Sequence, residues 1–355
     1  MKAVKKVTVP FFISHHGCPH TCIFCDQKII SGSSGNLPTT EEIMYKVEKW
    51  RQTAAGRPLE AAFFGGTFTA LPEAVQERLL ASLKPALSSG VVSSIRISTR
   101  PDYITKETVL RLAGNGVTTI ELGVQSMDDA VLETAHRGHT AADSYFAIDC
   151  IRSCGVVAGA QLMPGLPGDT TEKSLHSLQE VIKTGADFIR LYPVVVFQGT
   201  ALAAKYHQGD YHPLTVDNGV AICKILLKTA LRDGVDVIRI GLQAGDGIND
   251  DTVVAGCWHP ALGQLVHSEL YFDLLVQSAV GLSKHQKLTV KCHPDCVSDL
   301  LGHGRRNITR LLELGVQIEH VLQDKTIAKH DVVVEGVNHS FNGNIMETGI
   351  SVSSH

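Results

Sequence analysis

The sequence predicts an α/β protein, with a partial (β/α)6-type barrel followed by a small C-terminal α+β module. Strand-like and helix-like segments alternate along about two thirds of the 355 residues, and polar or glycine-rich motifs follow the predicted strand ends. Such alternation implies parallel strands with right-handed crossovers. A doubly wound sheet is the alternative, but barrels collect their active-site residues where the strands end, so the motif positions favour the barrel.

Hydrophobic periodicity and capping residues place the individual elements of the barrel. Strands are expected at residues 7–13, 61–64, 95–99, 119–124, 157–163 and 188–193, with a further candidate at 235–240. Helices are expected at 41–53, 72–88, 105–114, 128–136, 144–154, 171–184 and 216–233. The first helix is expected to be capped by Thr40, because two glutamates follow it in the first turn.

The pattern changes after about residue 245, which predicts a division of the chain. We expect the barrel at residues 1–245, a helical extension at 246–284, an α+β module at 285–340 and a flexible tail at 341–355. The module combines strand candidates at 287–292, 317–322 and 331–337 with two short helices divided at Gly302. Its final residues are polar and rich in serine and asparagine, as in frayed chain ends.

Composition describes an ordinary globular protein, with 44% hydrophobic and 19% charged residues. The net charge of −4 argues against a basic DNA-binding protein, although a local basic patch for RNA is compatible with it. We expect no signal peptide and no membrane association, since the chain has no apolar run of about 18 residues. Nine clustered cysteines favour a reducing cytoplasm.

Three of these cysteines lie within eight residues, in the run GCPHTCIFCDQ, as Cys18, Cys22 and Cys25. Three thiolates on one short loop cannot all form disulfides, but they suit zinc or the iron of an iron–sulfur cluster. A structural zinc site needs a fourth ligand. The candidates for it are His15, His16 and His20. A 4Fe-4S cluster held by three cysteines would instead keep one iron open for a substrate or cofactor.

An ordered set of motifs resembles the radical SAM superfamily, and within it the radical SAM half of the catalytic subunit of Elongator. Besides the cysteine loop, the motifs are FFGGTFTALP (63–72), STRPDYIT (98–105), IELGVQSMDDAVL (120–132), RGHT (137–140), LMPGLPGDT (162–170) and LYPVVVFQGTAL (191–202). The segment at 120–140 also resembles the oxygen-independent coproporphyrinogen III oxidases. Two features depart from the pattern: Ser98 stands where many relatives carry glutamate, and no acetyl-CoA-binding loop of an acetyltransferase domain follows residue 245.

The resemblance implies an enzyme in which the three cysteines hold a 4Fe-4S cluster and S-adenosylmethionine chelates the open iron. One electron, from a flavodoxin- or ferredoxin-type reductant, would cleave the cofactor to a 5′-deoxyadenosyl radical that abstracts hydrogen from substrate. The residues expected at S-adenosylmethionine are Phe24, Gly65, Gly66, Thr67, Ser98, Arg100, Gln125, Met163 and Gly165. Their alternatives are structural: a tight turn for the glycine pair, a surface salt bridge for Arg100 and a buried hydrogen bond for Gln125.

The substrate is open between an RNA base, tRNA above all, and a small molecule or tetrapyrrole. A non-catalytic metal-binding protein is the third hypothesis. The run LLGHGRRNI at 300–308 resembles the G-x-x-G loop of KH domains, which clamps a nucleotide backbone, although its fourth position is arginine. The RNA-binding candidates are therefore Arg305, Arg306 and Arg310, and solvated arginines at a helix start are the alternative.

Other residues have two interpretations each. Arg190 or Tyr192 could face the substrate, although a core tyrosine is the simpler interpretation. Two roles are open for three residues at a loop or helix end: they interact with the dipole of the helix end, or they contact the substrate. These residues are His136, Arg137 and His139. Small buried side chains are expected at Cys150, Cys154 and Cys223, and a second metal is an alternative for Cys257, Cys292 and Cys296, beside His259 and His293.

Overall fold

The computed structural model describes residues 6–32, 35–243, 247–249, 251–279, 287–337, 339–347 and 351–354. Contacts divide the chain into two compact units, one formed by Met1–Thr215 with Val235–Trp258 and one by Val216–Gly234 with His259–His355. The units do not divide at residue 245 as expected, since the first unit extends to Trp258 and the helix at Val216–Arg232 is grouped with the C-terminal residues. Among the described helices, none combines the length and the apolar character needed to cross a bilayer.

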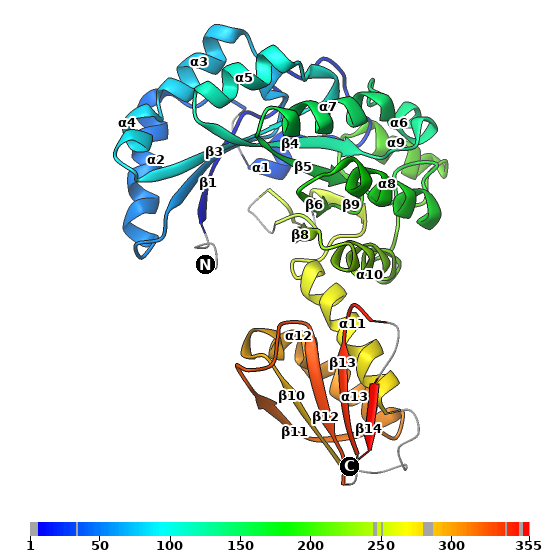
Figure 1. Ribbon diagram of the computed structural model, residues 1–355. Coiled ribbons are helices and arrows are strands. Elements are labelled where there is room, and N and C mark those ends of the chain that lie inside the picture. The colour runs from blue at the N-terminus through cyan, green and yellow to red at the C-terminus, as the bar shows by residue number, and fades with distance from the viewer. Residues whose placement is uncertain are drawn as a thin grey trace. The chain divides into compact units, whose positions relative to one another are not determined.

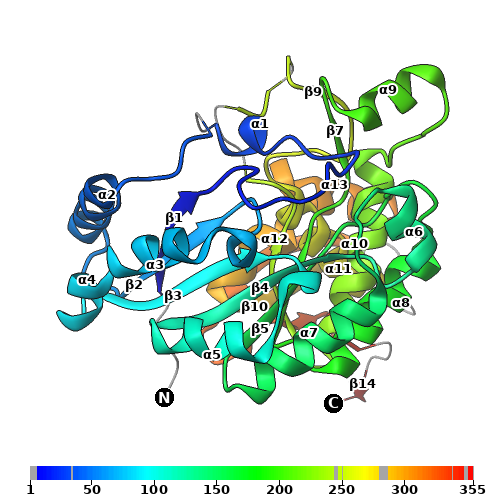
Figure 2. The ribbon, with the colours of Figure 1, turned by 90° about the horizontal axis from the view of Figure 1, so that it is seen from above.

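The first unit is built on a curled half-barrel of seven parallel strands (Figure 2). The strands are β1 (Val7–Phe12), β2 (Leu59–Phe64), β3 (Val92–Thr99), β4 (Val117–Gln125), β5 (Val157–Leu162), β6 (Phe188–Leu191) and β8 (Asp236–Ile240). They lie side by side in that order, and each neighbouring pair is parallel. The predicted partial barrel is therefore confirmed, with the candidate strand at 235–240 as its seventh member.

Helices follow the strands, and most of them lie along the outside of the curved sheet (Figures 1 and 2). They are α1 (Gln27–Ser31), α2 (Thr40–Thr53), α3 (Glu73–Ala81), α4 (Lys84–Ser88), α5 (Lys106–Gly114), α6 (Asp129–Thr134), α7 (Ala141–Ser153), α8 (Thr171–Thr184) and α9 (Ala201–Gln208). The cap of α2 is Thr39 and not Thr40, because Thr39 and Glu42 form a reciprocal capping box. The single helix expected at 72–88 is two helices, and Pro85 lies in the first turn of the second, where proline is tolerated.

Two short strands were not anticipated from the sequence. β7 (Val195–Phe197) and β9 (Val253–Gly256) pair antiparallel and form a separate two-stranded sheet. β9 falls within the expected helical extension at 246–284, which is wrong for that segment. Strands of three and four residues are too short to show a hydrophobic period, so the sequence offered no signal for them.

The second unit contains a five-stranded sheet and helices (Figure 1). Its elements are α10 (Val216–Arg232), α11 (Leu262–Ser278), β10 (Lys287–Cys292), α12 (Val297–Leu301), α13 (Arg306–Glu313), β11 (Gln317–Gln323), β12 (Asp331–Glu335), β13 (His339–Asn344) and β14 (Ser351–Ser354). The strand order is β11-β10-β12-β13-β14. Residues 341–344, expected in a flexible tail, are paired with β12 as part of β13, whereas tail residues 348–350 and 355 lie outside the described residues.

A ladder of alternating charges crosses the half-barrel sheet. Arg96 on β3 contacts Glu60 on β2 at 2.9 Å and Glu121 on β4 at 3.4 Å, and Arg190 on β6 contacts Glu121 at 2.7 Å. The two carboxylate side chains are only 4% and 3% exposed. Burying an ion is costly unless it is paired, so each rung of this ladder depends on its neighbours.

Arg96→Met should lower the free energy of unfolding by about 3 kcal/mol, because it leaves buried carboxylates without their shared cation. The matched control is Arg51→Met, which breaks an exposed pair with Glu48 of 2.7 Å and should change stability little. Urea titration of both variants measures the difference, and equal losses would contradict the role of the ladder.

Candidate functional site

A cavity of about 560 Å³ is lined by residues of the half-barrel strands and of the loops that follow them. The strand residues that line it belong to β1 to β7, and the loop between β1 and α1 supplies a further part of the wall. The volume falls within the range of small-molecule and cofactor sites. Its position at the carboxyl ends of parallel strands is where barrels place their chemistry.

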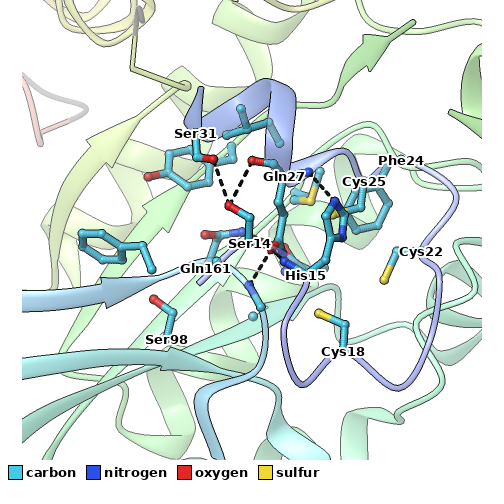
Figure 3. A pocket seen from close by; sticks show the side chains of 18 of the residues that line it. Ser14, His15, Cys18, Cys22, Phe24, Cys25, Gln27, Ser31, Ser98 and Gln161 are labelled. Carbon is cyan, nitrogen blue, oxygen red and sulfur yellow. Dashed lines mark hydrogen bonds between the residues drawn. The ribbon is translucent and has the colours of Figure 1, made fainter. Parts of the chain in front are cut away.

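The loop between β1 and α1 brings Cys18, Cys22 and Cys25 to this cavity (Figure 3). Two turns shape the loop: the Cys18 N–H donates to the His15 carbonyl and the Cys25 N–H to the Cys22 carbonyl, both at 3.2 Å. All three thiols line the same space, as the sequence predicted, and they are spread around it rather than clustered at one point. That spread suits a multinuclear centre, in which each thiolate binds a different iron.

Two glycines let this loop rest directly on the end of β2. Gly66 and Gly17 both have positive φ, +60° and +72°, and a Cβ on either would lie 2.3 Å from a backbone oxygen of the opposite segment. The Thr67 N–H donates to the His16 carbonyl at 2.8 Å, which joins the two segments. The glycine motif thus lets the cysteine loop pack directly against the end of β2, because no side chain fits between the two backbones.

Gln27, at the start of α1, fastens the same contact and was not identified from the sequence. Its side-chain Oε1 accepts from the N–H groups of His15 and Gly66, both at 2.6 Å. These partners lie twelve and 39 residues away in the sequence, so no local sequence pattern predicts the two hydrogen bonds. Ser14, Gln27 and Ser31 form a polar group beside the cysteine loop in Figure 3.

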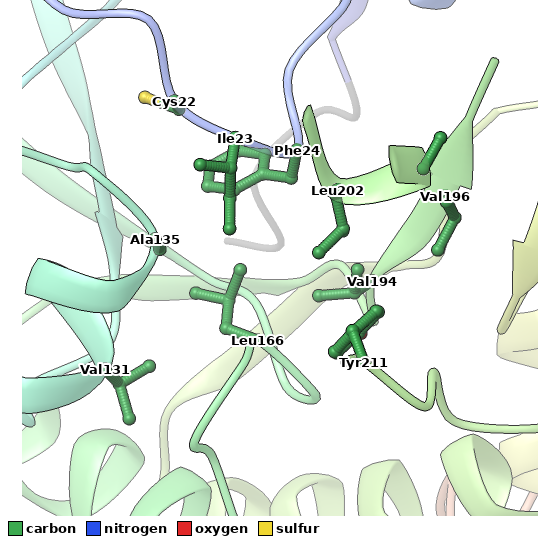
Figure 4. Packing of buried hydrophobic residues seen from close by; sticks show 11 residues of the cluster. Cys22, Ile23, Phe24, Val131, Ala135, Leu166, Val194, Val196, Leu202 and Tyr211 are labelled. Carbon is green, nitrogen blue, oxygen red and sulfur yellow. The ribbon is translucent and has the colours of Figure 1, made fainter. Parts of the chain in front are cut away.

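Apolar residues between the cysteines anchor the loop from its other side (Figure 4). Ile23 and Phe24 are 2% and 8% exposed and pack in a cluster with Val131, Ala135, Leu166, Val194, Leu202 and Tyr211. The Ile23 carbonyl also accepts from the Leu202 N–H at 2.8 Å. The sequence between the second and third cysteine is therefore a hydrophobic plug.

The thiols lie in a desolvated environment. Burial raises the pKa of Cys18, and burial together with the neighbouring Cys22 and Cys18 thiols raises the pKa of Cys25 to about 12. Three thiolates in this space require a compensating positive centre, which is what a bound metal centre supplies. One protein cation already contributes, since Arg137 Nη1 donates to Cys22 Sγ at 3.1 Å and Nη2 to the Gly123 carbonyl at 2.6 Å.

The histidines considered as a fourth zinc ligand have other contacts. The His15 ring accepts from the Gln27 N–H at 2.9 Å, and the His16 ring is 2.6 Å from the Gly35 carbonyl. His20 lines the cavity, with its ring packed against Gly138. In the described part of the chain, no three His, Cys, Asp or Glu side chains are grouped closely enough to hold a single metal ion.

Most of the residues expected at S-adenosylmethionine come together in the cavity. Its lining includes Phe24, Gly65, Gly66, Thr67, Ser98, Arg100, Gln125 and Met163. Gly165 is the exception and does not line the cavity in the described part of the chain. The Gly165 N–H donates instead to Asp169 at 2.8 Å, and its carbonyl accepts from the Tyr211 hydroxyl at 2.6 Å.

Two of the cavity residues, Arg100 and Gln125, also form hydrogen bonds with other side chains of the protein. Arg100 is 4% exposed and donates through two nitrogens to Asp102, each at 2.9 Å, so the expected salt bridge exists but is buried. Gln125 has φ +69° after an irregularity in the pairing of β4 with β5, and its Oε1 accepts from Gln161 at 3.3 Å. Positive φ in a residue other than glycine stores strain, and such strain is concentrated at functional sites.

The loop after α6 contributes to the site more than the sequence suggested. Arg137 contacts a cysteine, as described above, and His139 is 5% exposed with its Nε2 3.2 Å from the Val124 carbonyl. Burial, with the charges of Arg137 and Arg100, lowers the pKa of His139 to about 3. His139 is therefore neutral in the folded protein.

Among the described residues, the remaining six cysteines are not part of a group that could hold a metal ion. Cys150 and Cys223 are buried on helices, as expected, and Cys154 is partly exposed. Cys257 belongs to the first unit, whereas Cys292 and Cys296 belong to the second. The alternative of a second metal at these three cysteines has no support from the described residues.

Of the three RNA-binding candidates, one is already engaged. Arg310 contacts Glu269 at 2.5 Å, and its guanidinium lies 3.6 Å from the centre of the Phe272 ring. Arg305, with φ +64°, is exposed in the turn before α13, and Arg306 is exposed as the first residue of that helix. Of the three candidates, Arg305 and Arg306 therefore have exposed side chains, whereas Arg310 has protein partners on the described part of the chain.

Comparison with known proteins gives consistent matches. The model of the Radical SAM superfamily matches residues 12–181, and that of the Radical_SAM C-terminal domain matches residues 186–271. A tRNA uridine(34) acetyltransferase of Methanocaldococcus jannaschii is 27% identical over 73% of this chain and 54% of its own length. Elongator complex protein 3 of Danio rerio is 27% identical over 55% of this chain and 44% of its own length. The chain thus spans about half the length of these relatives.

A solved structure agrees on the fold. The archaeal Methanocaldococcus infernus Elp3 with an N-terminal deletion superimposes with a TM-score of 0.61 over 98% of this chain and 74% of that chain, at 20% identity. The likeness at this identity concerns the fold.

Gly66→Ala should prevent the cysteine loop from seating, because the added Cβ would meet the His16 carbonyl at 2.3 Å. We expect most of the iron uptake to be lost after anaerobic reconstitution. Gly56→Ala is the matched control, since Gly56 has a similar φ of +76° but no atom within 4 Å of the added Cβ. Iron analysis of both variants tests whether the contact of the cysteine loop with Gly66 is needed for cluster binding, and equal iron uptake would contradict that role.

His139 should make the fold sensitive to acid. Its pKa is lowered to about 3 in the folded protein, against an ordinary value near 6.5, so the unfolded chain binds the proton between these values. Stability should fall by roughly 1 kcal/mol for each pH unit below 6.5. Urea midpoints at neutral and mildly acidic pH should therefore differ less in His139→Gln than in the original protein, whereas His212→Gln, at an exposed histidine, should show the original difference.

Proposed function

We propose that this chain, which belongs to the radical SAM superfamily and is an enzyme of that class, modifies a base of an RNA, with tRNA as the favoured substrate. One observation carries the chemical part of the proposal: three cysteines of a rigidly seated loop face a cavity lined by the cofactor motifs. The names of the relatives, tRNA uridine(34) acetyltransferase among them, support the choice of RNA.

The cofactors of this superfamily are a 4Fe-4S cluster and S-adenosylmethionine. The donor set fits such a cluster, because burial raises the pKa of Cys18 and Cys25, so that their thiolates need a positive centre, and soft thiolates select iron or zinc. Cys18, Cys22 and Cys25 would hold it. When bound, the cluster supplies one electron and an open iron for S-adenosylmethionine, whose cleavage gives the 5′-deoxyadenosyl radical.

The residues of the chain would bind the cofactor and keep water away from it. Phe24 joins the hydrophobic plug to the cavity wall, and with Met163 it offers an apolar surface for adenine. Gly65 leaves backbone accessible at the end of β2, and Thr67 places its hydroxyl 3.6 Å from Cys18 Sγ. Arg100, held in position by Asp102, suits a carboxylate. Ser98 and Gln125 add polar side chains for the ribose or carboxylate.

An external reductant completes the proposal. The cluster needs one electron per turnover, and a flavodoxin or ferredoxin of the cytoplasm is the chemical class that supplies it. We place the protein in the cytoplasm for the same reason, since free thiols and an iron–sulfur cluster need a reducing compartment.

Mass spectrometry of tRNA nucleosides tests the function. A strain without this gene should lose or accumulate one modified nucleoside relative to the parent strain. The original gene should restore the profile, whereas Cys22→Ala should not and Cys154→Ala should. An unchanged nucleoside profile in the deletion strain would refute tRNA as the substrate.

The exposed turn of the second unit provides a further prediction. Replacing Arg305 and Arg306 by alanine should weaken tRNA binding and reduce its logarithmic salt dependence by roughly two, one for each phosphate that the variant no longer neutralises. Arg310→Ala should affect stability rather than the salt dependence, because its guanidinium is bound to Glu269 and Phe272. Filter binding at several salt concentrations measures both, and an unchanged slope in the double variant would contradict a role of this turn in binding tRNA.

A further inference from the structure

The cavity wall contains a group of side chains to which no cofactor contact has been assigned. Phe64 at the end of β2, Glu121 on β4, Arg190 on β6 and Tyr192 just after β6 all line the cavity. None of them is among the residues assigned above to the cluster or to S-adenosylmethionine. A cavity that holds both a cofactor and a substrate needs such a second set of contacts.

Arg190 is fixed in position and still has hydrogen-bond donors to offer. Its Nη1 donates to Glu121 Oε1 at 2.7 Å, and its guanidinium carbon lies 5.2 Å from the centre of the Phe64 ring and 5.6 Å from that of Tyr192. Its buried Nε has no hydrogen-bond partner among the described residues. A guanidinium has five N–H donors in one plane, so this side chain is a preorganised donor at the cavity wall.

Glu121 provides acceptors next to those donors. One of its oxygens accepts from Arg190 at 2.7 Å and the other from Arg96 at 3.4 Å. A carboxylate has about four acceptor positions, so lone pairs remain on both oxygens. Two arginines flank this carboxylate, whose side chain is only 3% exposed.

We propose that Arg190 and Glu121, together with the rings of Phe64 and Tyr192, form a subsite that binds the nucleobase to be modified. A donor beside an acceptor complements the hydrogen-bonding edge of a base, where a carbonyl oxygen or ring nitrogen lies next to an N–H group. The aromatic rings and the guanidinium plane offer surfaces on which a flat base stacks. This inference rests on the proposed function and specifies which side chains would recognise the RNA base.

The size of the cavity limits how the base is presented. The cavity, of about 560 Å³, must hold the cluster, S-adenosylmethionine and the reacting group together, and this volume is in the range of sites for small molecules. The nucleotide would therefore have to leave its stack and enter alone, as in other enzymes that act on bases. A single-stranded loop meets this requirement at lower cost than a duplex.

Arg96 offers a matched control for Arg190. Both arginines pair with Glu121 in the same buried ladder, with side chains 15% and 18% exposed, but Arg190 lines the cavity whereas Arg96 does not. A purely structural role of Arg190 through Glu121 should therefore be reproduced at Arg96. A role in base binding should be confined to Arg190.

The experiment measures nucleoside binding to the reconstituted holoprotein loaded with S-adenosylmethionine. Uridine, cytidine, adenosine and guanosine are the probes, with saturation-transfer NMR and equilibrium dialysis as the readouts. We expect one base to be preferred, and Arg190→Met to weaken its binding by about tenfold or more, the loss typical of a specific base contact. Arg190→Lys should lose part of the preference, whereas Arg96→Lys should leave binding and preference nearly unchanged. The affinity for S-adenosylmethionine should be the same in all of these proteins.

Four results would overturn the inference. Equal weakening in the Arg190 and Arg96 variants would indicate a structural role, and a parallel loss of S-adenosylmethionine affinity would assign the subsite to the adenine of the cofactor. Absence of nucleoside binding, in a protein that forms 5′-deoxyadenosine when reduced, would refute the base subsite while the superfamily chemistry stands. If the original holoprotein forms no 5′-deoxyadenosine, the proposed function fails and this inference fails with it.

Discussion

The direct backbone contact between the cysteine loop and the end of β2 is the constraint on which the rest of the site depends. Gly17 and Gly66 let the two backbones approach to distances that leave no room for a side chain. Gln27 accepts hydrogen bonds from His15 on one segment and from Gly66 on the other. The apolar residues between the cysteines anchor the same loop in a hydrophobic cluster. Held from both sides, the loop presents three thiols to one cavity. A ligand set that the protein's own contacts fix in place reduces the conformational entropy that metal binding has to overcome.

The half-barrel sheet supports this arrangement in two ways. Its strand ends bring motifs that are far apart in the sequence to one rim, as parallel strands do in any barrel. Its charge ladder from Glu60 to Arg190 places ionised side chains in a buried position where each is compensated by its neighbour. The last rung of the ladder is also part of the cavity wall, so the element that holds the strands together supplies polar groups to the site.

The sequence was informative where local patterns reflect the fold. Alternating periodicity predicted the parallel strands, and the spacing of the cysteines predicted their convergence, because both are properties of short segments. It was uninformative where a contact joins distant residues. Nothing near Gln27 indicates its bonds across the loop, and nothing near Arg310 indicates that Glu269 and Phe272 would engage it. The glycine pair was correctly expected to permit close backbone approach, but the partner of Gly66 is the chain's own cysteine loop, which a linear pattern does not reveal.

The central claim is that this seated loop holds a cluster with one iron open to S-adenosylmethionine. The most direct test is electron–nuclear double resonance of the reduced, reconstituted protein with S-adenosylmethionine labelled isotopically at its amino nitrogen and carboxylate. The account predicts hyperfine coupling from both labels to the cluster, and its loss in Cys18→Ala. A fully loaded cluster that shows no coupling to either label, with the cofactor bound, would contradict it.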